Sequence, residues 1–513
     1  MVNHLPQRGS VNGSISSANM RTLGRWHSQK LMTITSYAGH EATVRETHPD
    51  DSSRRSRMSR LGSKLTGLVA GFAILAGIGV ADATAASLQE SVSKAVATHP
   101  RIGALKSNRD AIDHELRQAR GLYLPQVDLR AAVGPEWSDS PGTRARDTNS
   151  TWDTRKESSI ILQQRIFDGF EADSEVAQQK ARSKSASYRV SESAQFTGLD
   201  AVEAHIEVLR FRKLIEAAER NVEIHRSYLG RVRERTESGA GTTDESAQAQ
   251  SRLDAAEAIL TDNIKGLRDA EAKYINIVGD APTELDDVPL PLAALPADID
   301  NALLLLAKNP TVKITDADIE TTEALIGLAE SRFYPHINLE LSGRWDDDLD
   351  GIEGRDRDAI ALVVLRWNLY RGGIDTANRN EAVERRAEAR NNRLVAVRNF
   401  EEEMRNSWAQ FEAESRRSEL LASAVEQNVI FRDAYSEQFD LGTRSLLDLL
   451  DAENELYSNT SQQLTAEYAR RFAAYRILAV GGELLQMLNV AQPEQATPHP
   501  ADEGFDVFGS SMM

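Results

Sequence analysis

The sequence predicts a mixed α/β chain in which long coiled-coil helices and a β-hairpin are written twice. Three observations support this fold class: an internal repeat of about 200 residues, two long stretches without proline, and two segments of alternating apolar and polar residues. A repeat of this length is too long for a solenoid, so it indicates that one large unit was duplicated. We expect each half to run helix, two strands, two helices.

The N-terminal region predicts an export signal that follows an extension. Residues 1–57 are rich in Ser and Arg and show no apolar periodicity, which indicates a disordered or mis-annotated extension. Residues 58–86 read as a signal peptide, with basic residues, a short apolar run and the small-x-small cleavage site Ala83-Thr84-Ala85. We expect translation to start at Met58 and the mature chain to begin near Ala86 or Ser87.

The composition argues against several classes of function. The chain has 60 Lys and Arg against 78 Asp and Glu, and this acidic balance disfavours nucleic acid as a partner. It has no cysteine, which excludes disulfides, thiolate metal sites and an N-terminal lipidated cysteine. We expect no enzyme activity and no cofactor, because no nucleophile–base group or phosphate loop stands out. Residues 346–357 resemble a calcium loop, but Arg357 stands where the loop needs Glu, so no metal site is expected.

Stretches without proline predict very long helices in both halves. No proline occurs between Pro141 and Pro282, and apolar residues three and four apart form coiled-coil-like seams there. Residues 170–237 should therefore form one nearly unbroken helix of about 100 Å, and the second half should contain its counterpart. The predicted domains are a first repeat at 87–280, a linker at 281–300, a second repeat at 301–490 and a flexible C-terminal tail at 491–513.

A β-hairpin is predicted early in each repeat. Apolar and polar residues alternate after Pro125 and again after Pro335, which is the period of a strand with one apolar face. Each strand is about ten residues long, enough to span a bilayer. The hairpins are expected at 123–168 and 333–370, with polar loops at 135–157 and 346–358.

Aromatic residues and helix breakers mark one edge of both hairpins. We expect the helix–strand junctions at Pro125, Pro335, Gly169 and Gly372. Aromatic side chains lie where strands begin or end, and these points share one level of a hairpin. A membrane girdle requires that arrangement. The girdle residues are Tyr123, Phe167, Phe333, Tyr334, Trp367 and Tyr370.

One chain cannot complete a membrane-spanning sheet of this kind. Four strands are too few to close a barrel, and open sheet edges are not tolerated in hydrocarbon. Two copies would supply eight strands and three copies twelve, and both numbers are permissible. The residues therefore predict an exported homo-oligomer with a shared small barrel and a long helical body.

Several motifs resemble the TolC-like outer-membrane factor family over about residues 87–490. They are LYLPQVDL and FYPHINL at strand entries, RIFDGF and NLYRGG at strand exits, and LGTRSLLDLLDAENELY at 441–457. The resemblance implies a homotrimer with a shared, twelve-stranded barrel in the outer membrane of a Gram-negative bacterium. It also implies a long helical tunnel in the periplasm, with the linker in an equatorial region around it.

The same resemblance implies a function. The trimer would conduct substrates to the exterior from an inner-membrane transporter and a periplasmic adaptor protein. The substrates would be proteins exported by type I secretion, or small molecules. A periplasmic coiled-coil adaptor or scaffold without a pore is the alternative, in which the strands would pack against a soluble domain.

A charged stripe at residues 441–457 is the candidate functional site. Helical spacing places Arg444, Asp448 and Asp451 on one side and leucines on the other. The resemblance implies that the two aspartates form acidic rings at the tunnel entrance and that Arg444 is a link that keeps it shut. In the first repeat Thr243 stands where Arg444 is expected, and Asp244 and Glu245 are the two candidates for the equivalent acid. An ordinary solvated helix face is the competing interpretation.

Overall fold

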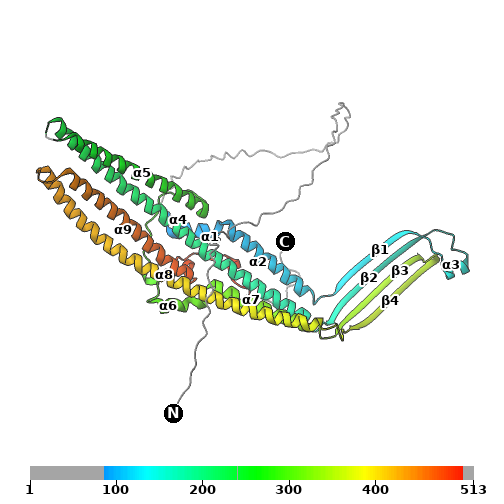
Figure 1. Cartoon of the computed structure of the whole chain (residues 1–513). Coiled ribbons are helices and arrows are strands. Elements are labelled where there is room, and N and C mark those ends of the chain that lie inside the picture. The colour runs from blue at the N-terminus through cyan, green and yellow to red at the C-terminus, as the bar shows by residue number, and fades with distance from the viewer. Residues whose placement is uncertain (1–85, 240, 501–513) are drawn as a thin grey trace, which may run out of the picture. The chain divides into compact units, whose positions relative to one another are not determined.

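The computed structural model describes residues 86–239 and 241–500 (Figure 1). The predicted N-terminal extension, the expected start at Met58, and the signal peptide up to and including its cleavage site at Ala83–Ala85 lie outside these residues. No helix in the described part of the chain combines the length and the apolar character needed to cross a membrane.

The first half contains the expected hairpin followed by two long helices, but it begins with two helices rather than one. The helices α4 and α5 are consecutive and pack along each other (Figure 1). The elements are α1 (Leu88–Thr98), α2 (Pro100–Gly121), β1 (Gln126–Glu136), α3 (Pro141–Arg146), β2 (Asp153–Phe167), α4 (Glu171–Glu237) and α5 (Thr243–Val278).

The second half repeats this order. Helices α4 and α8 have 67 residues each, about 100 Å of helix, so the duplication kept the length that the proline-free stretches predict. The elements are η1 (Leu292–Ala294), α6 (Ile299–Leu303), η2 (Leu304–Ala307), α7 (Pro310–Ser331), β3 (His336–Leu349), β4 (Ile352–Arg366), α8 (Ile374–Asp440), α9 (Leu446–Val480), α10 (Leu484–Met487) and η3 (Glu494–Ala496).

A repeated motif sets the start of the helix that precedes each hairpin. In ATHPRI, the His99 side chain accepts a hydrogen bond from the backbone N–H of Arg101 at 3.2 Å, and proline is the first helical residue. In AKNPTV, Asn309 caps α7 through the N–H of Val312 at 3.0 Å, again with proline first. Proline suits this position because an N–H group at the first helical residue has no hydrogen-bond partner within the helix, so its absence in proline costs nothing. The first motif therefore separates α1 from α2.

The four strands form one antiparallel sheet in the order β1-β2-β3-β4 (Figure 1). In-register neighbours bring apolar residues to one face, which we call the apolar face. Leu129 and Val363 on this face are 77% and 71% exposed, an arrangement that needs a nonaqueous or protein partner. Its residues are Val127, Leu129, Val133, Ile160, Leu162, Ile337, Leu339, Leu341, Ala361, Val363 and Leu365.

The predicted polar loop at 346–358 is wrong, because β3 and β4 stay paired until Leu349 meets Ile352. Charged residues there form cross-strand pairs: Asp347 lies 3.3 Å from Lys156 and 3.9 Å from Arg355. Opposite charges across strands stabilise a ladder, so a polar run is not evidence of a loop. The loop of the first hairpin is also shorter than predicted and contains α3.

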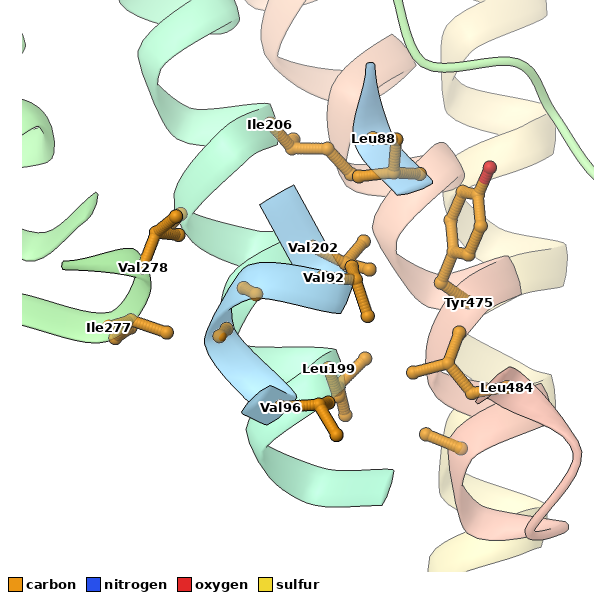
Figure 2. Close-up of a cluster of buried hydrophobic side chains, with 14 of the residues drawn as sticks. Leu88, Val92, Val96, Leu199, Val202, Ile206, Ile277, Val278, Tyr475 and Leu484 are labelled. Atoms are coloured by element: carbon orange, nitrogen blue, oxygen red, sulfur yellow. The ribbon is translucent and has the colours of Figure 1, made fainter. Parts of the chain in front are cut away.

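The largest buried cluster joins the start and the end of the chain (Figure 2). Side chains from α1, α4, α5, α9 and α10 meet there, among them Val92, Val202, Val278, Tyr475 and Leu484. This cluster packs the first repeat against the second.

The linker and the C-terminal segment are both tied to this body. The backbone N–H of Ala86 donates to the carbonyl oxygen of Glu284 at 2.7 Å, and Val288 is fully buried. The first part of the predicted C-terminal tail packs on α2 and α4, where Ala496 is buried and the Ser191 hydroxyl donates to Gln492 at 3.3 Å.

Candidate functional site

The charged stripe follows a glycine turn that both repeats share. The chain leaves α4 through Gly239 and α8 through Gly442, whose φ angles are +78° and +73°. Such angles are accessible to glycine without strain. Thr242 and Ser445 are then the N-caps of α5 and α9.

These caps settle the correspondence between the two repeats. Glu245 and Asp448 are both the third residue of their helix, which makes them equivalent. Gly241 therefore stands opposite Arg444, and the expected match with Thr243 is wrong. The two registers differ by two residues, and the N-cap positions, which are defined by backbone geometry, select between them.

Arg444 is held beside the turn by three groups. Its guanidinium lies 3.8 Å from the Asp448 carboxylate, donates to Gln438 at 3.1 Å and stacks on the Tyr435 ring at 4.0 Å. Ser445 donates its hydroxyl to Asp448 at 2.7 Å. An acid in the first helical turn is also stabilised by the helix dipole.

Asp451 is paired with a residue that the sequence reading missed. Arg252 of α5 donates from Nη2 to Asp451 Oδ1 at 2.6 Å. Arg252 is the single basic residue between Arg235 and Lys265, and that isolation is the signal that could have identified it. Arg231 of α4 and Asp440 of α8 form a second ion pair between the repeats, at 3.0 Å.

The two acids of the first repeat are engaged at the start of α5. The backbone N–H of Thr242 donates to the Glu245 carboxylate at 3.3 Å, which completes a capping box. A hydrogen bond from the Thr242 side chain lowers the pKa of Asp244, which is fully exposed. Both acidic side chains lie in the first turn of α5, where the helix dipole favours negative charge.

The opposite side of α9 is packed, as the spacing predicts. Leu446, Leu449 and Leu450 are buried against residues of α4 and α5. One charge lies on this packed side: Glu453, 2% exposed, accepts hydrogen bonds from Tyr228 at 2.7 Å and from Arg432 at 3.1 Å.

A buried histidine lies on the same part of α4. Burial lowers the pKa of His225, which is 4% exposed, so the ring is a core residue rather than a surface charge. Within the described residues, no three His, Asp or Glu side chains gather in a way that could hold a metal ion.

The helix–strand junctions differ between the two hairpins. Gly169 has φ +67°, and a Cβ there would lie 2.6 Å from Tyr334 Cβ and 2.7 Å from the Ser331 carbonyl oxygen. Gly372 has φ +62° with open space around it. The two prolines do not differ: Pro125 and Pro335 each lie three residues after the helix C-cap and immediately before β1 and β3.

The predicted girdle aromatics lie at the strand ends next to the helices. Five of them are more than 40% exposed, and Phe167 is half-buried. The Trp367 indole donates to the Phe333 carbonyl oxygen at 3.1 Å. Phe170, which the sequence reading missed, packs edge-on against Phe167 and Tyr334, with ring centroids 5.7 and 6.1 Å away.

Long paired helices lead into a sheet with an exposed apolar face. This arrangement defines the class of proteins in which a membrane-inserted sheet is joined to a helical body. The chain belongs to the outer membrane efflux protein family, whose sequence model matches residues 91–279 and 303–483. The two matched segments correspond to the two repeats.

Individual relatives agree with this assignment. The chain is 25% identical to the outer membrane efflux protein BepC of Brucella suis over 406 residues, 78% of this chain and 87% of BepC. It is 23% identical to the alkaline protease secretion protein AprF of Pseudomonas aeruginosa over 419 residues, 79% and 86% of the two chains. The structure of the outer membrane protein VceC from Vibrio cholerae superimposes with a TM-score of 0.68, at 16% identity, over 79% of this chain and 97% of VceC.

These comparisons confirm the predicted family and fold class, and they place the protein in the outer membrane with its helices in the periplasm. The relatives are channel proteins for export rather than enzymes.

Proposed function

We propose that the chain is one protomer of a homotrimeric channel that conducts substrates across the outer membrane. The observation that carries this proposal is the open sheet, whose edge strands β1 and β4 have no strand partner among the described residues. Unpaired edges beside an exposed apolar face are unstable in a bilayer. Three copies would supply twelve strands and remove every edge.

The channel would work as the outer part of a tripartite export system. An inner-membrane transporter and a periplasmic adaptor protein would deliver substrates to the helical tunnel. The names of the relatives include an efflux protein and a protease secretion protein, so both small molecules and proteins exported by type I secretion are proposed substrates. The six predicted aromatics would form the periplasmic girdle of the barrel.

The charged stripe would be the gate of this tunnel. In a trimer, Asp448 and Asp451 would each contribute three carboxylates around a narrow axis. Clustered carboxylates repel one another, attract cations and resist full ionisation. Arg444 would limit this repulsion within its own helix, and Glu245 would add the equivalent acid of the first repeat.

Single-channel conductance tests the proposal. The purified full-length protein should give stable, cation-favouring steps in a planar bilayer, and Asp448→Asn/Asp451→Asn should abolish the selectivity. The control Asp262→Asn/Asp269→Asn removes two exposed charges from α5 and should leave selectivity unchanged. Equal selectivity in all three proteins would remove the gate assignment while keeping the pore.

The mass of the assembly separates the remaining alternatives. Native mass spectrometry should give three chains, whereas two would indicate an eight-stranded barrel. A folded oligomer that never conducts would instead favour the adaptor or scaffold function.

A further inference from the structure

The apolar face of the sheet ends at a tryptophan. Along β3 it runs from Ile337 to Trp345, about 27 Å of strand, which matches the roughly 25 Å apolar band of membrane barrels. The indole of Trp345 lies back over Gly343, where a Cβ would come within 3.1 Å of its Cη2. Trp345 is 49% exposed, and a tryptophan in this position is typical of a membrane interface.

Charged residues from three strands lie beside and immediately beyond this tryptophan on the same face, and all but one of them are basic. Lys156, Asp347 and Arg355 are in register across β2, β3 and β4, and Arg357 is in register with Trp345. Together these five residues line much of an open cavity of about 480 Å³. Its lining also includes the acids Glu157, Asp346 and Asp356, at strand positions that alternate to the other face of the sheet. We call Lys156, Arg355 and Arg357 the basic rim.

The basic rim carries more positive charge than the chain neutralises. Lys156 and Arg355 share the single carboxylate of Asp347, at 3.3 and 3.9 Å. Arg357 is exposed and forms no ion pair with the described residues. Cations next to hydrocarbon are costly unless an anion accompanies them, so a bound anion would stabilise the cations on this face of the sheet.

The geometry points to a lipid phosphate as that anion. We propose that the basic rim binds the phosphate of a lipid head group, while the acyl chains lie along the apolar face below Trp345. Arginine and lysine are the usual donors to phosphate, and arginine can bind it with two parallel hydrogen bonds. This inference rests on the proposed function, because it requires the sheet to be inserted in a membrane.

Native mass spectrometry of the full-length protein in neutral detergent tests the inference. The probes are a bisphosphorylated lipid A, the same lipid without its phosphates, and inorganic phosphate. The wild-type protein should prefer the bisphosphorylated lipid, and Arg357→Gln should weaken its binding about fivefold, the effect expected for one charge near a membrane surface. Loss of both arginines in Arg355→Gln/Arg357→Gln should remove the preference.

Arg130→Gln is the matched control. Arg130 is exposed and forms no ion pair with the described residues. It lies one residue along the strands from the level of Trp345 and Arg357, and on the other face of the sheet. It should leave lipid binding unchanged. Equal binding of both lipids, equal loss in Arg130→Gln, or competition by inorganic phosphate would each overturn the proposal of a lipid site. Conductance of Arg357→Gln should match the wild type, so failure of the channel function is detected separately.

Discussion

Arg252 of α5 donates to Asp451 of α9 across 2.6 Å, and this contact joins the two repeats beside the proposed gate. The side chains of Arg252 and Asp451 are 35% and 57% exposed. Water screens such a pair, so it can bias the gate but cannot lock it. The packed side of α9 adds contacts to two other helices, because the buried Glu453 accepts hydrogen bonds from Tyr228 of α4 and Arg432 of α8.

Arg252→Gln should therefore make the gate open only slightly more often. An exposed ion pair contributes about 0.2–1 kcal/mol, which corresponds to about a 1.4–5-fold shift in an equilibrium. Open probability in planar bilayers measures this shift. Lys265→Gln removes an exposed cation of the same helix and should have no effect. A change well above tenfold in Arg252→Gln would mean that this one pair controls the gate.

Tyr228→Phe should destabilise the helical body more than the loss of an exposed contact. The mutation removes the hydroxyl that donates to Glu453 at 2.7 Å and leaves a buried carboxylate with Arg432 as its remaining partner. A hydrogen bond to a charged group contributes about 1.5–3 kcal/mol. Thermal unfolding followed by circular dichroism in detergent should show a lower midpoint.

Tyr435→Phe is the control for that experiment. The Tyr435 ring stacks under Arg444, but its hydroxyl makes no hydrogen bond with the described residues. Its melting midpoint should equal that of the wild type. Similar midpoints for Tyr228→Phe and Tyr435→Phe would show that the Glu453 contacts contribute little.

Gly169→Ala should impair folding of the first hairpin, whereas Gly372→Ala should be tolerated. Both glycines have positive φ angles, which cost an alanine about 1–2 kcal/mol. Gly169 alone also meets neighbours, with a Cβ position 2.7 Å from a carbonyl oxygen that cannot easily move. The amount of oligomer recovered from membranes measures the difference. Equal yields would exclude this steric explanation.

Mild acid should destabilise the core through His205. Its Nε2–H donates to the Asp286 carbonyl oxygen at 3.0 Å, so Nδ1 accepts from the Ser91 hydroxyl, and Tyr274 in turn contacts Ser91 at 2.8 Å. Burial lowers the pKa of His205, so the folded chain binds a proton less readily than the unfolded chain, in which histidine titrates near pH 6.5. The contribution of neutral His205 to the free energy of unfolding is therefore complete above pH 6.5, and it decreases as the pH falls below that value.

Melting midpoints at pH 7.5 and 5.5 test this direction. The loss is at most about 1.4 kcal/mol per pH unit for one histidine. His205→Gln should show a smaller difference between the two pH values, whereas His114→Gln, at an exposed position of α2, should behave like the wild type. An unchanged difference in His205→Gln would assign the acid sensitivity to other groups.

The sequence by itself determined the long helices, the duplication and the two hairpins. These features follow from local chemistry: proline is absent from 170–237, proline and an N-cap start α2 and α7, and alternation after Pro125 and Pro335 sets the apolar face. Each needs only residues close in the chain, so a pattern reveals it. The charged stripe of α9 was readable for the same reason.

Only the tertiary structure decided the partners of those elements. The pairing of Arg252 with Asp451 and of Tyr228 with Glu453 joins residues about 200 positions apart, and helical spacing on one segment says nothing about the other. The extent of the second hairpin also depended on partners, because Lys156 and Arg355 stabilise Asp347 in a ladder where its own neighbours suggested a loop. Long-range charge pairing, unlike periodicity, leaves no mark on a single segment.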